Sequence, residues 1–149
     1  MSGLAIFLVA LMIGSSQACR CAVTPLGQRY CNSKFAILAK VTQIQESITN
    51  FGPWTYTLEV GAIFRDEDGD ITWGTSATVK SSSSSAACGV FLQQDHTYIL
   101  AGGKQSQDLW LNSCSAISID MTSSSLQEQL EIVSLVLSVP EQCPYLPGA

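Results

Sequence analysis

Apolar and polar residues alternate through the middle of the chain. In the run WTYTLEVGAIF, residues 54–64, apolar side chains occupy every second position, which is the pattern of a strand with one buried face. The same alternation continues over 71–80. Three further apolar runs, 35–45, 97–103 and 109–114, are also predicted to be strands. The apolar positions of the two alternating runs are Trp54, Tyr56, Leu58, Val60, Ala62 and Phe64, then Ile71, Trp73, Ala77 and Val79.

The C-terminal part of the chain has helical periodicity instead. Four apolar residues recur there at spacings of four, three and four, which gives one apolar stripe on a helix. Ser125 and Glu128 form a capping-box pair at its start, and Pro140 is expected to stop it. A shorter helical turn is predicted over 28–34. The four residues of the stripe are Leu126, Leu130, Val133 and Leu137.

Two loop segments carry unusual composition. The acidic run RDEDGD, 65–70, has its glycine too early for an EF-hand calcium loop, so we interpret it as an Asp-Gly-containing hairpin turn. Five consecutive serines, 81–85, would usually indicate a flexible linker. Because this run lies between strands and leads into Cys88, we expect a tethered loop.

The predicted elements favour a mainly β fold. About five strands with one or two flanking helices suggest a small closed antiparallel barrel of the OB type. Closing the sheet removes the exposed strand edges that an open sheet would leave.

The N-terminus resembles a secretory signal peptide. Residues 4–14 are apolar, too few to span a bilayer, and small residues follow up to Ala18. We therefore expect residues 1–18 to be removed, which makes Cys19 the first residue of a secreted, extracellular protein. The net charge of −5 gives no reason to bind nucleic acid, and no second apolar segment is long enough for a membrane anchor. A tail, 144–149, follows the last cysteine.

All six cysteines lie behind this leader, and an even count in an oxidising compartment predicts disulfides. Fifteen pairings are open, and the simplest arrangement bridges each of three early cysteines to one of three late ones. Structural zinc is disfavoured because the chain has no Cys-x-x-Cys and only one histidine, His96. The cysteines are Cys19, Cys21, Cys31, Cys88, Cys114 and Cys143.

The sequence shows no arrangement of catalytic residues. His96 follows Asp95 in an expected turn, where a surface histidine needs no catalytic role, and no serine-elbow motif accompanies it. Every cysteine is expected to be paired, so none remains as a nucleophile. We therefore predict that the protein is not an enzyme.

Four ordered motifs resemble the tissue inhibitors of metalloproteinases. The run CRCAVTPLGQRYCN, 19–32, has Cys-x-Cys, a third cysteine ten positions later and then Asn32, as the family's inhibitory domain does. FAILAKV resembles its first strand, SAACGVFL its Ser-x-x-Cys-Gly-Val loop, and YILAGG a later strand. The resemblance covers 19–143 and implies a single netrin-like domain of the OB type. It also implies three disulfides, Cys19–Cys88, Cys21–Cys114 and Cys31–Cys143.

The function that the resemblance implies is inhibition of secreted or cell-surface zinc metalloendopeptidases. The free α-amine and carbonyl oxygen of Cys19 would chelate the zinc of the target, so the chain needs no cofactor of its own and shares zinc only with its partner. Extracellular matrix is a further expected partner, and the inhibitor is expected to be a monomer. The residues that the resemblance assigns to protease binding are Cys19, Arg20, Cys21, Ala22, Asn32, Ala86, Ala87 and Cys88.

Arg20 departs from the pattern of the family, which usually has Thr or Ser at this position. A guanidinium in an apolar pocket without a partner costs at least about 1–3 kcal/mol. A second hypothesis therefore stays open, in which the chain is a netrin-type binding module that engages a receptor or matrix protein without inhibiting a protease.

Overall fold

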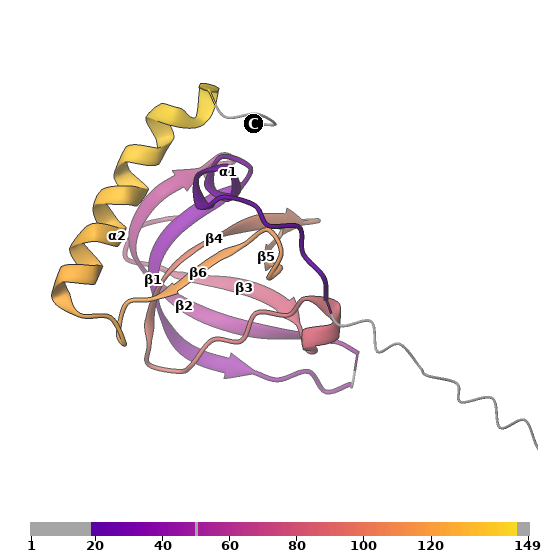
Figure 1. Cartoon of the computed structure of the whole chain (residues 1–149). Coiled ribbons are helices and arrows are strands. Elements are labelled where there is room, and N and C mark those ends of the chain that lie inside the picture. The colour runs from indigo at the N-terminus through magenta and orange to yellow at the C-terminus, as the bar shows by residue number, and fades with distance from the viewer. Residues whose placement is uncertain (1–18, 50, 146–149) are drawn as a thin grey trace, which may run out of the picture.

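The computed structural model describes residues 19–49 and 51–145, so the predicted signal peptide lies outside the described residues. Six strands and two α-helices are present, with two short 3₁₀ helices (Figure 1). The strands are β1 (Phe35–Gln45), β2 (Pro53–Asp66), β3 (Ser76–Ser82), β4 (Thr97–Gln105), β5 (Asp108–Leu111) and β6 (Ile117–Asp120). The helices are α1 (Leu26–Cys31), η1 (Ser85–Ala87), α2 (Leu126–Ser138) and η2 (Val139–Tyr145).

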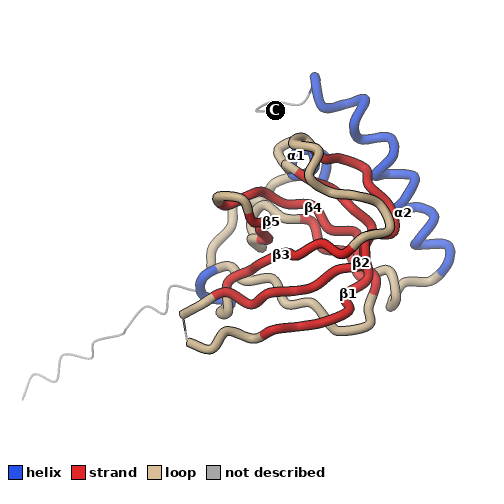
Figure 2. The backbone as a smooth tube through the Cα atoms, turned by 180° about the vertical axis from the view of Figure 1, so that it is seen from behind, coloured by secondary structure: helices blue, strands red, loops and turns tan. Residues whose placement is uncertain are grey.

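The sheet closes on itself through β4. The strand order is β1-β2-β3-β5-β4-β6, and an additional pairing of β1 with β4 completes a ring of β1, β2, β3, β5 and β4. The strands form this ring in both views of the molecule (Figure 2). Every pairing among the described strands is antiparallel except that of β3 with β5, which is parallel over Val79–Ser81. The predicted closed barrel is thus confirmed, with one parallel pair that the sequence analysis did not anticipate.

Two apolar cores hold the fold together. The first fills the barrel and contains the inward residues of β1, β2 and β4, among them Phe35, Leu58 and Leu100, all without exposed surface. The second lies between the outer face of the barrel and the helices, around Tyr30 of α1 and Val136 of α2. The helices therefore cover one side of the barrel (Figure 1) and leave the opposite side to loops.

Three strand predictions are confirmed and two are corrected. β1 spans the predicted 35–45, β2 contains 54–64, and β4 extends the predicted 97–103 by two residues. The run 71–80 is wrong in its first half, because β3 begins only at Ser76 and Trp73 lies exposed in the preceding loop. The strand predicted over 109–114 ends at Leu111, where a turn begins.

Other expectations also need correction. Phe64 does not share the barrel face of β2 but packs in the second core, because irregularities in the β1–β2 register turn the strand over before its end. β6 was not predicted at all. The capping box of Ser125 and Glu128 is confirmed. The leucines of the predicted stripe on α2 are exposed, however, and the helix is buried instead at Val136.

Candidate functional site

Two neighbouring disulfides join three distant segments at one edge of the barrel. Cys19 is bonded to Cys88 and Cys21 to Cys114, with Cα–Cα distances of 5.1 and 5.0 Å. The four sulfur atoms all lie within 4.8 Å of one another. We call the surface formed by residues 19–24, 85–88 and 112–115 the bridge edge. It gathers seven of the eight residues that the sequence analysis assigned to binding.

The third disulfide lies away from this edge. Cys31 of α1 is bonded to Cys143 of η2, with a Cα–Cα distance of 5.3 Å. All three bonds connect the pairs that the resemblance implied. The third therefore fastens the C-terminal helices to α1, while the first two shape the bridge edge.

The loop that carries Cys88 is held by its own backbone. The Ser84 hydroxyl accepts from Ala87 N at 3.1 Å, and Cys88 N donates to Ser85 O at 3.1 Å. Gly89 N donates to Ser84 O at 2.9 Å. A Cβ on Gly89 would lie 2.3 Å from the carbonyl oxygen of Ser82, so the loop folds this tightly only with glycine there.

Buried polar groups support this loop from beneath. The Ser81 hydroxyl donates to Leu111 O at 2.8 Å and accepts from Val90 N at 2.7 Å, which joins β3, β5 and the segment after Cys88. The Tyr56 hydroxyl donates to Val90 O at 3.0 Å. Sequence reasoning missed both supports, because Ser81 is hidden in a run of serines and Tyr56 in a regular alternation. The first two serines of that run belong to β3 and are not loop residues.

The segment around Cys114 is a turn bound to the Cys88 loop. Ser113 N donates to Cys88 O at 2.9 Å, and Cys114 N donates to the Asn112 side-chain oxygen at 2.9 Å. Cys21 is thus anchored to a turn that is itself fixed to the partner of Cys19.

Arg29 of α1 holds the segment that follows Cys21 in place. Its Nε donates to Thr24 O at 3.0 Å and its Nη1 to Ala116 O at 3.3 Å. Asn32, the eighth predicted residue, is the exposed C-cap of α1. It lines a cavity of about 170 Å³ together with Thr24, Arg29 and Cys114, so it lies outside the three segments of the bridge edge but next to two of them.

The bridge edge is exposed and almost uncharged. Arg20, Cys21 and Ala22 are exposed, as are Ala86 and Ala87 on the opposite side of the first bridge. Arg20 is the only ionisable side chain within 19–24, 81–91 and 112–116. The edge therefore presents small side chains, the exposed Val23, one guanidinium and backbone groups.

Large apolar residues extend the surface beyond the bridges. Ile48 and Phe51, in the loop between β1 and β2, are 96% and 97% exposed. This loop lies beside the Cys88 loop because Pro53, which follows it, pairs with Ser82. Phe91 packs edge-on against Trp54 at a ring distance of 5.4 Å. Sequence reasoning missed this extension, although two large apolar residues in the polar run SITNFGP were the available signal.

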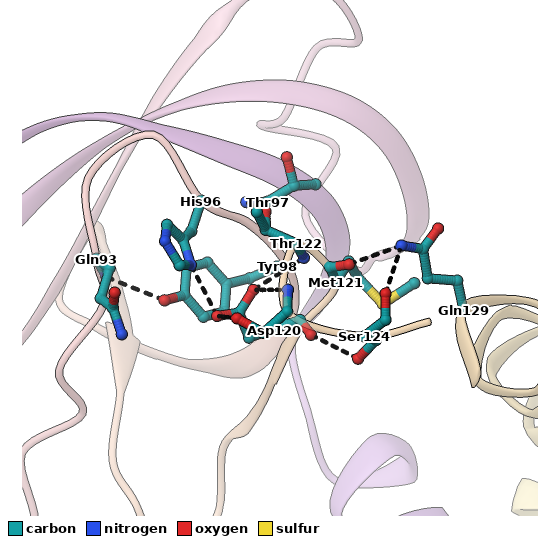
Figure 3. A network of polar contacts seen from close by, with 10 residues as sticks. Gln93, His96, Thr97, Tyr98, Asp120, Met121, Thr122, Ser124 and Gln129 are labelled. Atoms are coloured by element: carbon teal, nitrogen blue, oxygen red, sulfur yellow. Dashed lines mark hydrogen bonds and ion pairs between the residues drawn. The ribbon is translucent and has the colours of Figure 1, made fainter. Parts of the chain in front are cut away.

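His96 has a structural partner. Its Nδ1 donates to Asp120 Oδ2 at 2.8 Å, and Asp120 also accepts from Thr122 N and from the hydroxyl of Ser123, both at 2.9 Å (Figure 3). Burial alone would raise the pKa of Asp120. The hydrogen bonds to its carboxylate, first of all that of His96, lower the pKa by more than burial raises it, so the net pKa lies below its usual range. The pair ties β4 to the end of β6 and includes no nucleophile.

The acidic run is a turn from Glu67 onward, whereas its first two residues, which the sequence analysis also assigned to the turn, belong to β2. The Asp66 carboxylate accepts from Gly69 N at 3.1 Å and Ile71 N at 2.8 Å. Lys104 Nζ lies 2.7 Å from Asp68 and also pairs with Asp70, and both contacts raise the pKa of Lys104. Glu67 is paired with Lys34 and Arg65, so the carboxylates of the run are occupied by backbone donors and by basic side chains.

No helix within the described part of the chain is long and apolar enough to cross a membrane.

Comparison with protein families gives one match. The family model described as tissue inhibitor of metalloproteinase matches residues 17–133. No curated protein matches the chain. Members of this family are secreted and are inhibitors of metalloproteinases, not enzymes. Since the match covers most of the sequence, and since the closed barrel and its disulfides agree with it, the chain belongs to the tissue inhibitor of metalloproteinase family.

Proposed function

We propose that the processed chain inhibits zinc metalloendopeptidases through the bridge edge, with Cys19 as a bidentate ligand to the zinc of the target. The observation that carries this proposal is the position of Cys19, which is fixed by a disulfide beside an exposed, nearly uncharged loop. The proposal requires export and cleavage after Ala18, so that Cys19 has a free amine.

The chemistry follows from the open coordination position of a catalytic zinc. Such a zinc has three protein ligands and keeps a fourth position for the hydrolytic water. The amine nitrogen and the carbonyl oxygen of Cys19 would close a small chelate ring on the metal and displace that water. A peptidase that has lost this water has no nucleophile with which to cleave the inhibitor.

Only a neutral amine has a lone pair for the metal. A chain-terminal amine titrates at about 7.7–8.0, so zinc competes with a proton at neutral pH. The three segments of the bridge edge contain no carboxylate that could stabilise the ammonium form of this amine. Inhibition is therefore expected to strengthen as the pH rises from 6.5 to 8.

The rigidity of the edge favours tight binding. Cys19 is tied to Cys88, whose carbonyl is bonded to Ser113 and whose loop rests on Ser81 and Tyr56. Because these contacts already fix the backbone, little conformational entropy remains to be lost on association.

Arg20 would enter the pocket of the target that lies next to the zinc. Its side chain is exposed and is the only ionisable side chain of the edge. A deep or water-filled pocket would let the guanidinium reach solvent, whereas a shallow apolar pocket would not. We therefore propose that this inhibitor favours proteases with deep or hydrated pockets.

Arg20 also favours a second candidate function. The exposed cation, together with the exposed apolar residues Ile48 and Phe51, could bind a receptor or matrix protein without a metal. In that case the free amine of Cys19 would have no role.

The test compares three forms of the secreted protein against a panel of zinc endopeptidases. These are the mature chain, a chain with one alanine added before Cys19, and a control with one alanine added after the C-terminus. Intact mass first confirms a Cys19 start and the loss of six hydrogens, two for each of the three disulfides. We expect inhibition by the mature chain and the control, and none by the N-terminally extended chain. Equal inhibition by all three forms would contradict chelation, and no inhibition by any form would favour the binding module.

A further inference from the structure

The cavity of about 170 Å³ that Asn32 lines lies between α1, β4 and the turn around Cys114. Its wall contains one charged side chain, Arg29 of α1, and no acidic one. The volume is several times the share of a water molecule, about 30 Å³, and below the roughly 300 Å³ of pockets that hold drug-sized ligands. The cavity therefore has room for a small polar group. The side chains that line it together with Arg29 are Thr24, Asn32, Ser33, Cys114 and Ser115.

Arg29 has no counterion in the described part of the chain, where no carboxylate lies within 4.0 Å of its guanidinium. Carboxylates are not scarce, since the chain has 12 acidic and 7 basic residues. Apart from Arg29, the one basic side chain without an ion pair is Arg20, which is exposed, whereas Arg29 is half-buried. The basic side chains that do form ion pairs are Lys34, Lys40, Arg65, Lys80 and Lys104.

Two backbone carbonyls fix the guanidinium of Arg29 at the wall of the cavity. Its Nε donates to Thr24 O at 3.0 Å and its Nη1 to Ala116 O at 3.3 Å. Among the residues that the structure describes, neither N–H bond of Nη2 has an acceptor. A guanidinium prefers the oxygens of a carboxylate or a phosphate, and one that is already fixed loses little freedom when it binds them.

Two further side chains add donors at the wall of the cavity. The side-chain amide of Asn32 and the hydroxyl of Ser115 have no hydrogen-bond partner within 19–49 and 51–145, although the backbone N–H groups of both residues are bonded. The hydroxyl of Ser33, by contrast, donates to Tyr30 O at 2.6 Å. An amide and a hydroxyl can each donate to an oxygen of a bound anion. The cavity thus combines one cation with two neutral donors.

We propose that this cavity binds a carboxylate, with Arg29 as its cation and with Asn32 and Ser115 as further donors. The charge of the wall decides between a carboxylate and a phosphate. A carboxylate carries one negative charge at neutral pH, which Arg29 balances, whereas a phosphate group carries about −1.5 to −2. In a chain with a net charge of −5, the second negative charge would stay unbalanced.

The carboxylate can come from two sources, because the cavity adjoins the bridge edge. Thr24, Cys114 and Ser115 belong both to the wall of the cavity and to that edge. The segment that carries Thr24 leads from the bridge edge directly to α1 (Figure 1). One source is therefore an Asp or Glu side chain of a protease bound at the edge, and the other is a small dissolved carboxylate. Only the first source rests on the proposed function.

The first test is independent of protease inhibition. Sodium acetate is titrated into the mature, disulfide-bonded chain, and the backbone amide signals are followed by NMR against sodium chloride of equal ionic strength. We expect saturable shifts at Asn32, Gly103 and Ser115 with acetate only, and weaker binding of inorganic phosphate. Arg29→Gln should abolish saturation, and Ser115→Ala should weaken acetate binding about threefold.

Asn32→Asp tests the site without touching the contacts that fix Arg29. The new carboxylate supplies the missing counterion from within the chain, so acetate binding should weaken about tenfold or more. Gln43→Glu is the matched control, because it adds the same charge at an exposed position of β1 that does not line the cavity, and it should change binding less than twofold. Absence of saturation, equal shifts with chloride, tighter binding of phosphate, or equal effects of Asn32→Asp and Gln43→Glu would overturn the proposal.

The second test identifies the source of the carboxylate. Inhibition of a sensitive protease is measured in sodium acetate at a saturating concentration and in sodium chloride of equal ionic strength. If a side chain of the protease enters the cavity, acetate and Asn32→Asp should both raise the inhibition constant, and chloride should not. An unchanged inhibition constant would assign the cavity to a dissolved carboxylate. Failure of the chain to inhibit any protease would contradict the proposed function and leave the acetate titration as the test of the cavity.

Discussion

Cys88 adopts the left-handed backbone conformation, with φ of 59°, and this geometry directs its sulfur toward Cys19. The residue after it has no room for a side chain, since a Cβ on Gly89 would lie 2.3 Å from Ser82 O and 2.9 Å from Ser84 O. The backbone of two consecutive residues therefore determines where the bridge, and with it Cys19, lies.

Gly89→Ala should damage the bridge edge more than the barrel. The new methyl group must displace backbone atoms, which costs about 1–3 kcal/mol of stability and shifts the Cys88 loop. We expect a lower melting temperature and weaker protease inhibition. Gly103→Ala is the control, because a Cβ at Gly103 has no atom within 4 Å, and it should change neither quantity. Equal effects of both substitutions would show that the lack of space for a side chain at Gly89 does not determine the melting temperature or the inhibition.

Arg20→Thr should strengthen inhibition of proteases with shallow apolar pockets. The substitution removes the desolvation of an unpartnered guanidinium, about 1–3 kcal/mol, which corresponds to roughly 5- to 160-fold in the inhibition constant. Proteases with deep or hydrated pockets should show little change. Lys40→Thr, which removes an exposed cation far along the chain from the edge, is the control for net charge. A uniform change across the panel would argue against entry of this side chain into a pocket.

At the scale of elements, the connection from β6 to α2 is ordered by one carboxylate. Asp120 accepts hydrogen bonds from His96, Thr122 and Ser123, and Thr122 in turn accepts from Thr97 N at 2.8 Å. The capping box of Ser125 and Glu128 then starts the helix. Because the pKa of Asp120 is lower in the folded chain than its ordinary value, its ionised form stabilises this connection.

Stability should therefore fall in acid. A carboxyl with a depressed folded pKa contributes its stabilisation above the unfolded pKa, about 3.9, and loses it as the pH falls through the folded pKa. Asp120→Asn should lower the melting temperature at pH 6 and flatten its decline between pH 5 and 2.5. Asp95→Asn, at an exposed carboxylate paired only with Lys40, should leave the decline as it is. An unchanged decline in Asp120→Asn would show that other carboxyls control acid stability.

Elements that a local pattern of apolar and polar residues determines were predictable from the sequence. Elements whose position depends on tertiary contacts were not. The strand 35–45 and the capping box were found because local residues determine them. β6 is four residues long and is stabilised by pairing with β4, which no local pattern reports. The buried face of α2 was misjudged because the helix has apolar residues on two faces, and only packing decides that Val136 is covered and Leu130 is not.

At the scale of the whole molecule, the three disulfides have different tasks. Cys31–Cys143 joins α1 to the chain after α2 and closes a separation of 112 residues. Cys19–Cys88 and Cys21–Cys114 fix the segment that precedes α1 against loops of the barrel. The bond between Cys31 and Cys143 therefore mainly stabilises the fold, and the other two fix the position of Cys19.

Removing these bonds one at a time, by replacing both cysteines of a bond, should separate the effect on stability from the effect on inhibition. Cys31→Ser with Cys143→Ser should lower stability by about 2–5 kcal/mol and leave inhibition intact below the melting temperature. Cys19→Ser with Cys88→Ser keeps a terminal amine and carbonyl but frees the segment, so inhibition should weaken roughly tenfold or more. Both cysteines of a pair are replaced because a lone thiol would lie within 4.8 Å of the remaining bridge and exchange with it. The same loss of inhibition in both double variants would contradict this division.

The candidate site was partly predictable for a related reason. The cysteines and the residues beside them are contiguous motifs, so resemblance to a family indicates them directly. Ser81 and Tyr56 act through contacts with Val90, which lies 9 and 34 residues away, and Ser81 also through its contact with Leu111. Ile48 and Phe51 join the surface only because Pro53 pairs with Ser82. Such positions follow from the topology and not from any motif.

Closure of the ring by β1 and β4 has a kinetic consequence. Phe35 pairs with Gly102 and Lys40 with Thr97, so the chain must bring together segments some sixty residues apart before the barrel exists. Topologies dominated by such distant pairings fold slowly, in milliseconds to seconds. During this interval the apolar inner face of β1 is uncovered, and the newly made chain would then be most prone to aggregate.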